Sequence, residues 1–207
     1  MTARASALTL ALVTLVVTGV VAAQQAGSTI STGRIFESLS LAEGMTVCEM
    51  GAGDGELSIA AAKAVGPGGR VYTSELGDDR IRTLRERVQS SGLSNIAVVA
   101  GDAVKTNFPE GSCDALFMRN VYHHFMDPPA LNASLFASVK PGGRVSVVDF
   151  TPPGREAERP ADRAKDGMHG IASETLAAEL KAAGFEPVAS EAGAQRWFMV
   201  VVARPKS

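Results

Sequence analysis

Short apolar runs alternate with longer amphipathic segments through most of the chain. In the segment 78–92, Ile81, Leu84 and Val88 recur at helical spacing among charged residues, which predicts an amphipathic helix. The same reasoning predicts further helices at 55–65, 127–143 and 172–185, and strands at 45–50, 70–76, 95–103, 113–120 and 144–150. Strands that alternate with helices predict an α/β domain with a doubly wound, mostly parallel sheet buried on both faces.

The end of the chain breaks this alternation. Two further strands are predicted at 186–192 and 195–205, and the few residues between them are too short for a crossover. The sheet should therefore have seven strands and close with an antiparallel hairpin. Two similar stretches, "GPGGRVYTSEL" and "KPGGRVSVVDF", each suggest a helix stop followed by a strand. Near the other end, 31–41 could form a short helix.

The first 23 residues have the pattern of an export signal. Arg4 is followed by an apolar stretch from Ala7 to Ala23, and small residues end it before Gln24. We expect residues 1–23 to be a signal peptide or an N-terminal membrane anchor, with a cytoplasmic extension as a further alternative. We expect the folded domain to occupy 28–207. The predicted location is periplasmic or secreted, or membrane-anchored, and it is cytoplasmic if the start is misassigned.

Composition narrows the classes of partner. The chain has 207 residues and is 45% hydrophobic, which suits one domain with a sizeable core. Its formal net charge of −2 gives no general attraction to nucleic acid or anionic lipid. We therefore expect no nucleic-acid partner, and membrane contact only through an uncleaved N-terminal segment.

Cysteine and histidine usage predicts neither a disulfide scaffold nor a metal centre. Cys48 and Cys113 lie in or beside apolar runs, so we expect buried free thiols, with a bridge as the alternative. His123, His124 and His169 show no metal-ligand spacing, and no cysteine pair lies near them.

The stretch "VCEMGAGDGELS" is predicted to run from a strand through a glycine-rich turn into a helix. Gly51, Gly53 and Gly55 would let the backbone approach a ligand closely at the carboxyl end of the strand. The dinucleotide fingerprint requires a further glycine where Glu56 stands, and an acidic side chain there would crowd a pyrophosphate. The turn therefore favours a ligand without phosphate groups.

Two acidic residues at the next strand ends extend this argument. Glu75 ends the second strand, where a carboxylate can accept both hydroxyls of a ribose. Asp102 follows the third strand and can accept a hydrogen bond from the amino group of adenine. No Lys or Arg stands at these three strand ends, so a nucleoside without phosphates fits best.

Five ordered motifs between about residue 30 and residue 203 make the chain resemble the class I S-adenosylmethionine-dependent methyltransferases. They are "VCEMGAGDGELS", "VYTSEL", "GDA", "CDALFMRNVYHHF" and "VKPGGRVSVVDF". The resemblance implies a Rossmann-like methyltransferase fold and S-adenosyl-L-methionine as cofactor. It is closest to the small-molecule branch of the family.

The resemblance and the strand-end chemistry together suggest a set of cofactor-binding residues. Glu49 would order the turn and the amino-acid end of the cofactor, and Asn120 or its neighbours would offer a carbonyl to the ammonium group. The full set is Glu49, Gly51, Ala52, Gly53, Gly55, Glu75, Leu76, Asp102, Ala103, Arg119 and Asn120.

Candidate catalytic residues follow the fourth strand. Tyr122, His123 and His124 form the one cluster of titratable side chains near the expected methyl group, and a neutral histidine could accept a proton there. We expect His123 to face the cleft, and the alternative is that these residues are structural. The segment "TPPGREAERPADRAKDGMHG" is predicted to be a mobile lid, from which His169 could touch the substrate.

The resulting prediction is an enzyme that moves a methyl group to an oxygen, nitrogen or carbon nucleophile, on a small molecule. A non-catalytic binding protein on the same fold is one alternative, because an exported enzyme would lack an obvious supply of cofactor. An NAD-dependent oxidoreductase is another, and Glu56 argues against it.

Overall fold

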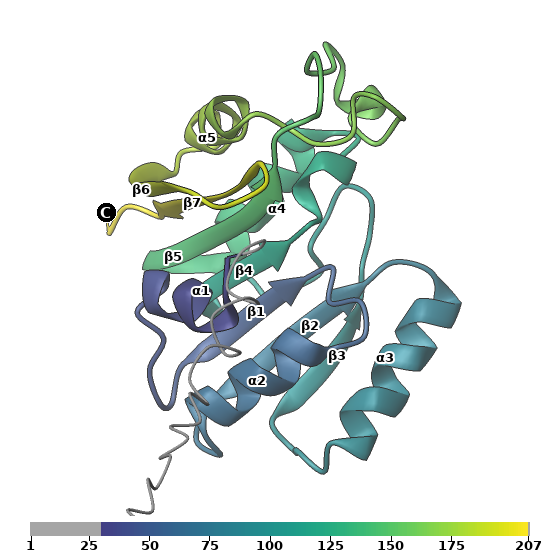
Figure 1. Cartoon of the computed structure of the whole chain (residues 1–207). Helices are drawn as coiled ribbons and strands as arrows, with labels where there is room; N and C mark the ends of the chain where they lie inside the picture. Colours follow the sequence, from purple (N-terminus) through teal and green to yellow (C-terminus); the bar gives the residue numbers. More distant parts are fainter. Residues whose placement is uncertain (1–29, 207) are drawn as a thin grey trace, which may run out of the picture.

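A single mixed sheet organises the protein (Figure 1). The computed structural model describes residues 30–206. The strand order is β3-β2-β1-β4-β5-β7-β6, in which β7 is antiparallel to both of its neighbours. The strands are β1 (Thr46–Met50), β2 (Arg70–Glu75), β3 (Ile96–Ala100), β4 (Cys113–Arg119), β5 (Val139–Phe150), β6 (Glu186–Ala192) and β7 (Trp197–Ala203). The predicted seven-stranded, doubly wound sheet with a closing hairpin is confirmed.

Helices cover both faces of the sheet, as the continuous apolar strands require. The helices are α1 (Thr32–Ser38), α2 (Glu56–Val65), α3 (Asp78–Ser90), α4 (Pro128–Ser138) and α5 (Ser173–Ala182), with short 3₁₀ turns η1 (Tyr122–His124) and η2 (Pro160–Asp162). Alternate residues of β4 point to opposite cores: Phe117 packs with α1 and α2, whereas Leu116 and Met118 pack with α4 and α5. This two-sided burial leaves the carboxyl ends of β1 to β4 as the place for a ligand.

The two glycine-proline stretches turn out to differ in structure. The first ends α2 at Gly66, as predicted, with a positive φ of 67°. The second lies inside β5, because α4 already ends at Ser138. The pairing of β4 with β5 shifts register between Cys113 and Ala115, and Gly142 has a φ of 80° there. The expectation of one device used twice is therefore wrong for the second copy, where the glycines form an irregularity within the strand.

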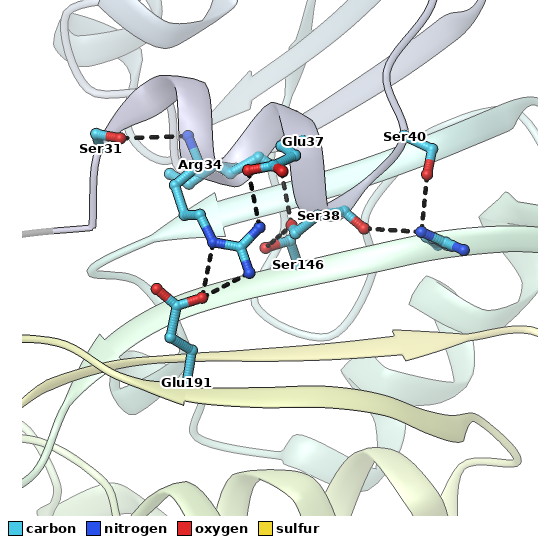
Figure 2. Close-up of polar contacts among 9 residues, drawn as sticks. Ser31, Arg34, Glu37, Ser38, Ser40, Ser146 and Glu191 are labelled. Atoms are coloured by element: carbon cyan, nitrogen blue, oxygen red, sulfur yellow. Dashed lines mark hydrogen bonds and ion pairs between the residues drawn. The ribbon is translucent and has the colours of Figure 1, made fainter.

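The short helix α1 is tied to the edge of the sheet by polar contacts (Figure 2). The Arg34 guanidinium lies between the carboxylates of Glu37 and Glu191, at 3.1 and 2.7 Å. The Ser38 hydroxyl donates to the Ile35 carbonyl and lies 3.1 Å from the Ser146 hydroxyl of β5. Beneath these contacts the fully buried Ile35 side chain anchors α1 in the core.

A disulfide bond joins Cys48 of β1 to Cys113 of β4, so the expectation of free thiols is wrong. Their Cα atoms lie 5.8 Å apart, within the usual range for a bridge, and both residues are fully buried in the core beside α4 and α5. The two residues are 65 positions apart in sequence. Burial in apolar runs fits a thiol or a bridge equally, so the sequence could not separate the two.

The segment between β5 and α5 is held in place at several points. Arg163 is almost completely buried and forms an ion pair with Glu179 of α5 at 2.6 Å. Glu156 accepts hydrogen bonds from the Ala172 amide and the Thr175 hydroxyl, both at 2.9 Å. Glu156 thus provides hydrogen-bond acceptors for polar groups at the start of α5. These contacts make the lid, residues 151–170, a built part of the domain rather than a bare loop.

The predicted signal or anchor, residues 1–23, lies outside the described residues. Within residues 30–206, every helix is too short or too polar to span a bilayer.

Removing the disulfide should lower stability substantially. We expect a Cys48→Ala/Cys113→Ala variant to lose about 2–5 kcal/mol of unfolding free energy, because the bridge closes a long loop in the unfolded chain. Urea denaturation measures the change, and the parent protein with reductant should approach the variant. Two reactive thiols per denatured, unreduced parent chain would contradict the bridge.

Candidate functional site

A cavity of about 660 Å³ opens at the carboxyl ends of the central strands. This volume is within the usual range for small-molecule sites. Ten of the eleven predicted cofactor-binding residues line it: Glu49, Gly51, Ala52, Gly53, Glu75, Leu76, Asp102, Ala103, Arg119 and Asn120. The eleventh, Gly55, lies outside the lining. The sheet therefore brings together residues that are up to 71 positions apart in sequence, from Glu49 to Asn120.

Two positions of the turn after β1 can hold only glycine, because of their backbone conformation and their close neighbours. Gly51 has a φ of 71°, and a Cβ on it would lie 2.4 Å from Cγ2 of Val121. Gly55 precedes α2 with a φ of 81°, and a Cβ there would lie 2.8 Å from Leu84 of α3. Gly53, in contrast, borders the cavity, and a Cβ on it would meet nothing within 4 Å. Gly55 thus serves the packing of α2 and α3, whereas Gly53 leaves space at the ligand side.

Glu75 holds the turn as well as the cavity wall. Its carboxylate accepts hydrogen bonds from the Gly53 amide at 2.7 Å and from the Leu76 amide at 2.9 Å. The side chain is mostly buried, with Arg80 at 3.8 Å. A charged acceptor fixed in this way is positioned for ligand hydroxyl groups without further ordering of its side chain.

Glu49 is a buried acid below the turn. The Ser58 hydroxyl of α2 donates to it and also lies 2.7 Å from the Thr73 hydroxyl of β2. Burial raises the pKa of Glu49 to about 8, against the opposing effect of the Ser58 hydrogen bond. The residue therefore links β1, α2 and β2 beside the cavity.

Asp102 and Asn120 occupy the other two strand ends at the cavity. Asp102 is exposed and accepts from the Val104 amide at 2.8 Å, so one oxygen orders its own turn. Asn120 has a φ of 61°, and its backbone amide donates to the Val148 carbonyl at 2.8 Å. This left-handed conformation turns the chain sharply after β4, from the strand into η1.

Two arginines border the cavity. The sequence shows no Lys or Arg at the first three strand ends, so it did not lead us to expect two positive charges here. Arg80 projects from α3 toward Glu75, and Arg119 at the end of β4 lies 3.8 Å from Glu56. Arg119 was predicted from the family resemblance, but Arg80 was missed. Arg80 stands in the first turn of α3, shortly after Glu75, and this position could have indicated that it lies beside that carboxylate.

The three predicted catalytic residues separate in the structure. Tyr122 is fully buried away from the cavity lining, and its hydroxyl donates to Glu179 at 3.0 Å. Burial, together with the Glu179 carboxylate, raises the pKa of Tyr122 well above its usual range. Tyr122 is thus built into the packing between η1 and α5.

The histidines exchange the positions expected for them. His123 is completely buried and His124 lines the cavity, so the expectation that His123 faces the cleft is wrong. Partial desolvation in the cavity wall, followed by the neighbouring His123 and His169, lowers the pKa of the largely exposed His124, which keeps its imidazole neutral at pH 7. His124 is the histidine able to accept a proton at the cavity.

His169 of the lid meets both of these histidines. Its Nε2 atom lies 2.9 Å from Nε2 of His123, and one ligand nitrogen from each of the three rings falls within 4.8 Å of the others. On the far side of His123, the Nδ1 atom lies 2.8 Å from Oδ1 of the buried Asp149. All three histidines of the chain therefore lie together, next to the cavity that His124 lines.

Comparisons with known proteins identify the class of fold. A family model described as "Methyltransferase domain" matches residues 24–190. The structure is similar to that of a SAM dependent methyltransferase from Aquifex aeolicus, with a TM-score of 0.72 and 23% identity over 84% of this chain and 90% of that chain. The chain belongs to this methyltransferase domain family. The resemblance to class I S-adenosylmethionine-dependent methyltransferases, with their Rossmann-like fold, is confirmed.

Two curated relatives show the range within the family. The ubiquinone/menaquinone biosynthesis C-methyltransferase UbiE of Ectopseudomonas mendocina is 34% identical over 54% of this chain and 44% of its own length. Nocamycin O-methyltransferase of Saccharothrix syringae is 28% identical over 58% of this chain and 43% of its own length. The chain thus matches less than half the length of these relatives, and they transfer methyl groups to different atoms according to their names.

The raised pKa of Glu49 predicts a pH-dependent stability. A carboxyl whose pKa rises from 4.5 to about 8 on folding binds its proton more tightly in the folded state. Its contribution is fully present below the unfolded pKa and is lost as pH rises toward about 8. One such proton gives a slope of up to about 1.4 kcal/mol per pH unit.

A Glu49→Gln variant should lack this decline, because the amide stays neutral. Chemical denaturation of parent and variant at intervals from pH 5 to 8 measures the difference. Glu86→Gln, on the exposed face of α3, is the matched control and should follow the parent. Parallel pH profiles for Glu49→Gln and the parent would show that Glu49 is ionised throughout.

Proposed function

We propose that this chain transfers a methyl group from S-adenosylmethionine to a small-molecule acceptor. The observation that carries the proposal is the convergence of the glycine turn, Glu75 and Asp102 on one cavity, in a chain of the methyltransferase domain family. These groups suit an adenosine without phosphates.

The cavity residues fit the parts of this cofactor. Glu75, fixed by two backbone amides, would accept the ribose hydroxyls, and Asp102 would accept the adenine amino group with its remaining oxygen. The open space at Gly53 admits a ligand against the backbone. Glu49 and Asn120 would lie toward the amino-acid end, and the exposed Leu76 side chain would cover the base.

Methyl transfer asks little of the protein beyond position. The cofactor supplies an activated methyl group, and the cavity walls orient the acceptor and exclude water. Phe125 and Leu131 provide an apolar wall beside His124. The neutral imidazole of His124 would take a proton from an oxygen or nitrogen acceptor as the new bond forms. Carbon acceptors that lose a proton could use the same group.

A non-catalytic binding protein on this fold is the second candidate. One observation supports the enzyme over the binding protein: His124 borders the same cavity as the proposed cofactor residues. For the third candidate, an NAD-dependent oxidoreductase, Glu56 again counts against a pyrophosphate, since it lines the cavity next to the turn.

Ligand titration tests the proposed cofactor. We expect S-adenosylmethionine and S-adenosylhomocysteine to bind in calorimetry and NAD to give no saturable heat, because the cavity offers acceptors for a nucleoside and an acidic residue at the turn. Glu75→Gln should weaken S-adenosylhomocysteine binding by about 1–3 kcal/mol, roughly 5- to 150-fold, through loss of a charged acceptor.

The control for this titration is again Glu86→Gln, which lies outside the cavity and should bind like the parent. Thermal melts of Glu75→Gln separate lost ligand contacts from a loosened turn, because Glu75 also bonds Gly53. Saturable NAD binding with no response to S-adenosylhomocysteine would refute the proposal.

We also propose that the protein acts outside the cytoplasm, as a mature domain that begins near Gln24. The apolar segment from Ala7 to Ala23 supports this, and so does the buried disulfide, because structural disulfides persist in oxidising compartments. A cofactor made in the cytoplasm would then have to reach that compartment.

Mass spectrometry tests the processing site. Expressed in a bacterium with its N-terminus intact, the protein should be recovered from the periplasmic fraction with its first residue near Gln24. An Ala23→Arg variant, which places a bulky charge at the predicted −1 position, should remain unprocessed. A full-length cytoplasmic product that starts at Met1 would contradict export.

A further inference from the structure

We propose that His123, His124 and His169 form a binding site for a divalent transition-metal ion next to the cofactor cavity. Three imidazole nitrogens within 4.8 Å of one another are the donor set that binds zinc, cobalt, nickel or copper ions. This proposal goes beyond methyl transfer and does not depend on the identity of the cofactor.

One pair of ring nitrogens already lies near the separation of two ligands on a coordinated ion, and the third ring is adjacent. Two imidazole nitrogens on one tetrahedral zinc ion, each about 2.0–2.1 Å from it, lie about 3.3 Å apart. The Nε2 atoms of His123 and His169 are already 2.9 Å apart, and the rings of His123 and His124 have centroids 4.0 Å apart. Small rotations of the two exposed rings, His124 and His169, would admit an ion between the three nitrogens.

Asp149 prepares the buried ligand. Its carboxylate already accepts from the amides of His123 and Phe150, at 3.1 and 2.9 Å, so it also accepts from Nδ1–H of His123. That hydrogen bond places the proton on Nδ1, so Nε2 carries a lone pair, which accepts from Nε2–H of His169 here and would bind the ion once His169 has lost that proton or turned its other nitrogen inward. A carboxylate behind a histidine is the common second layer of metal sites, where it fixes the ring and raises its basicity.

The lid presents His169 from a fixed backbone. The amide of Gly170 donates to the Arg163 carbonyl and that of Ile171 to the Phe150 carbonyl, both at 3.0 Å. Gly170 has a φ of 125°, and a Cβ on it would lie 2.4 Å from the Phe150 carbonyl oxygen, so the chain must carry glycine directly after His169. The third ligand is thus brought to the others by a tightly built turn.

The site would serve the acceptor side of the cavity. His124 lines the cavity, so an ion held by the three rings would lie next to it. Three protein ligands with one open position are typical of zinc sites that bind a water molecule or a substrate oxygen. Such a site therefore favours a methyl acceptor that binds the ion through an oxygen atom, such as that of a hydroxyl or an enol.

Metal titration of the full-length chain, made with an affinity tag free of histidine and stripped with chelator, tests the site. We expect one Co²⁺ per chain, with the intense visible absorption of a tetrahedral or five-coordinate ion, and competition by Zn²⁺. His124→Gln and His169→Gln should each weaken binding at least about 10-fold, and Asp149→Asn about 10- to 100-fold. Asp166→Asn, an exposed acid on the same lid, should bind like the parent.

Thermal melts check the folding of each variant. If Asp149→Asn fails to fold, the His169→Gln variant still tests the site, because His169 is exposed. Binding that survives the double change His124→Gln/His169→Gln would place the ion elsewhere and overturn the proposal. A parent chain that takes up no Co²⁺ would overturn it too, and would leave the three rings as a hydrogen-bonded stack. No cofactor is present in these titrations, so neither result bears on whether S-adenosylmethionine binds. An ion held by His124 would occupy a lone pair of its ring and so compete with its proposed role as proton acceptor.

Discussion

The arrangement of η1 and its histidines depends on the hydrogen bonds made by the buried carboxylate of Asp149. Asp149 lies at the end of β5 with no exposed surface, where an unpaired charge would be very costly. Its partners are the His123 amide, the His123 ring and the Phe150 amide, so the chain after β4 must return to β5 to satisfy it. That return places η1 across the strand ends and turns His124 toward the cavity.

A second polar centre fastens the elements around this turn. Glu179 of α5 accepts from the Tyr122 hydroxyl and from the Arg163 guanidinium of the lid. The Tyr122 hydroxyl in turn accepts from the Asn132 amide of α4 at 2.7 Å. Side chains from η1, the lid, α4 and α5 are therefore joined through one carboxylate, so that the position of His169 is coupled to the packing of two helices.

The sequence predicted that the glycine turn, Glu75 and Asp102 meet at one place, and it misplaced the histidines that follow β4. The glycine turn, Glu75 and Asp102 each follow a strand, and parallel strands bring their carboxyl ends together without further information. The side chains of η1 depend instead on Asp149, 26 residues beyond His123, so local spacing could not show which histidine is buried. The disulfide and the Arg163–Glu179 pair are likewise long-range contacts that leave no local pattern.

The disulfide gives the protein an unusual covalent topology. Between Cys48 and Cys113 the chain carries α2, β2, α3 and β3, together with the glycine turn and Asp102, which lie between these elements and beyond β3. This half of the domain is thus closed into a ring by the disulfide, beside the pairing of β4 with β1. Fewer conformations are open to a ring than to a linear chain, so this half starts folding with part of its entropy already lost. A protease that cuts once within the ring would open a loop and still leave one covalent molecule, which makes this half resistant to fragmentation wherever thiols stay oxidised.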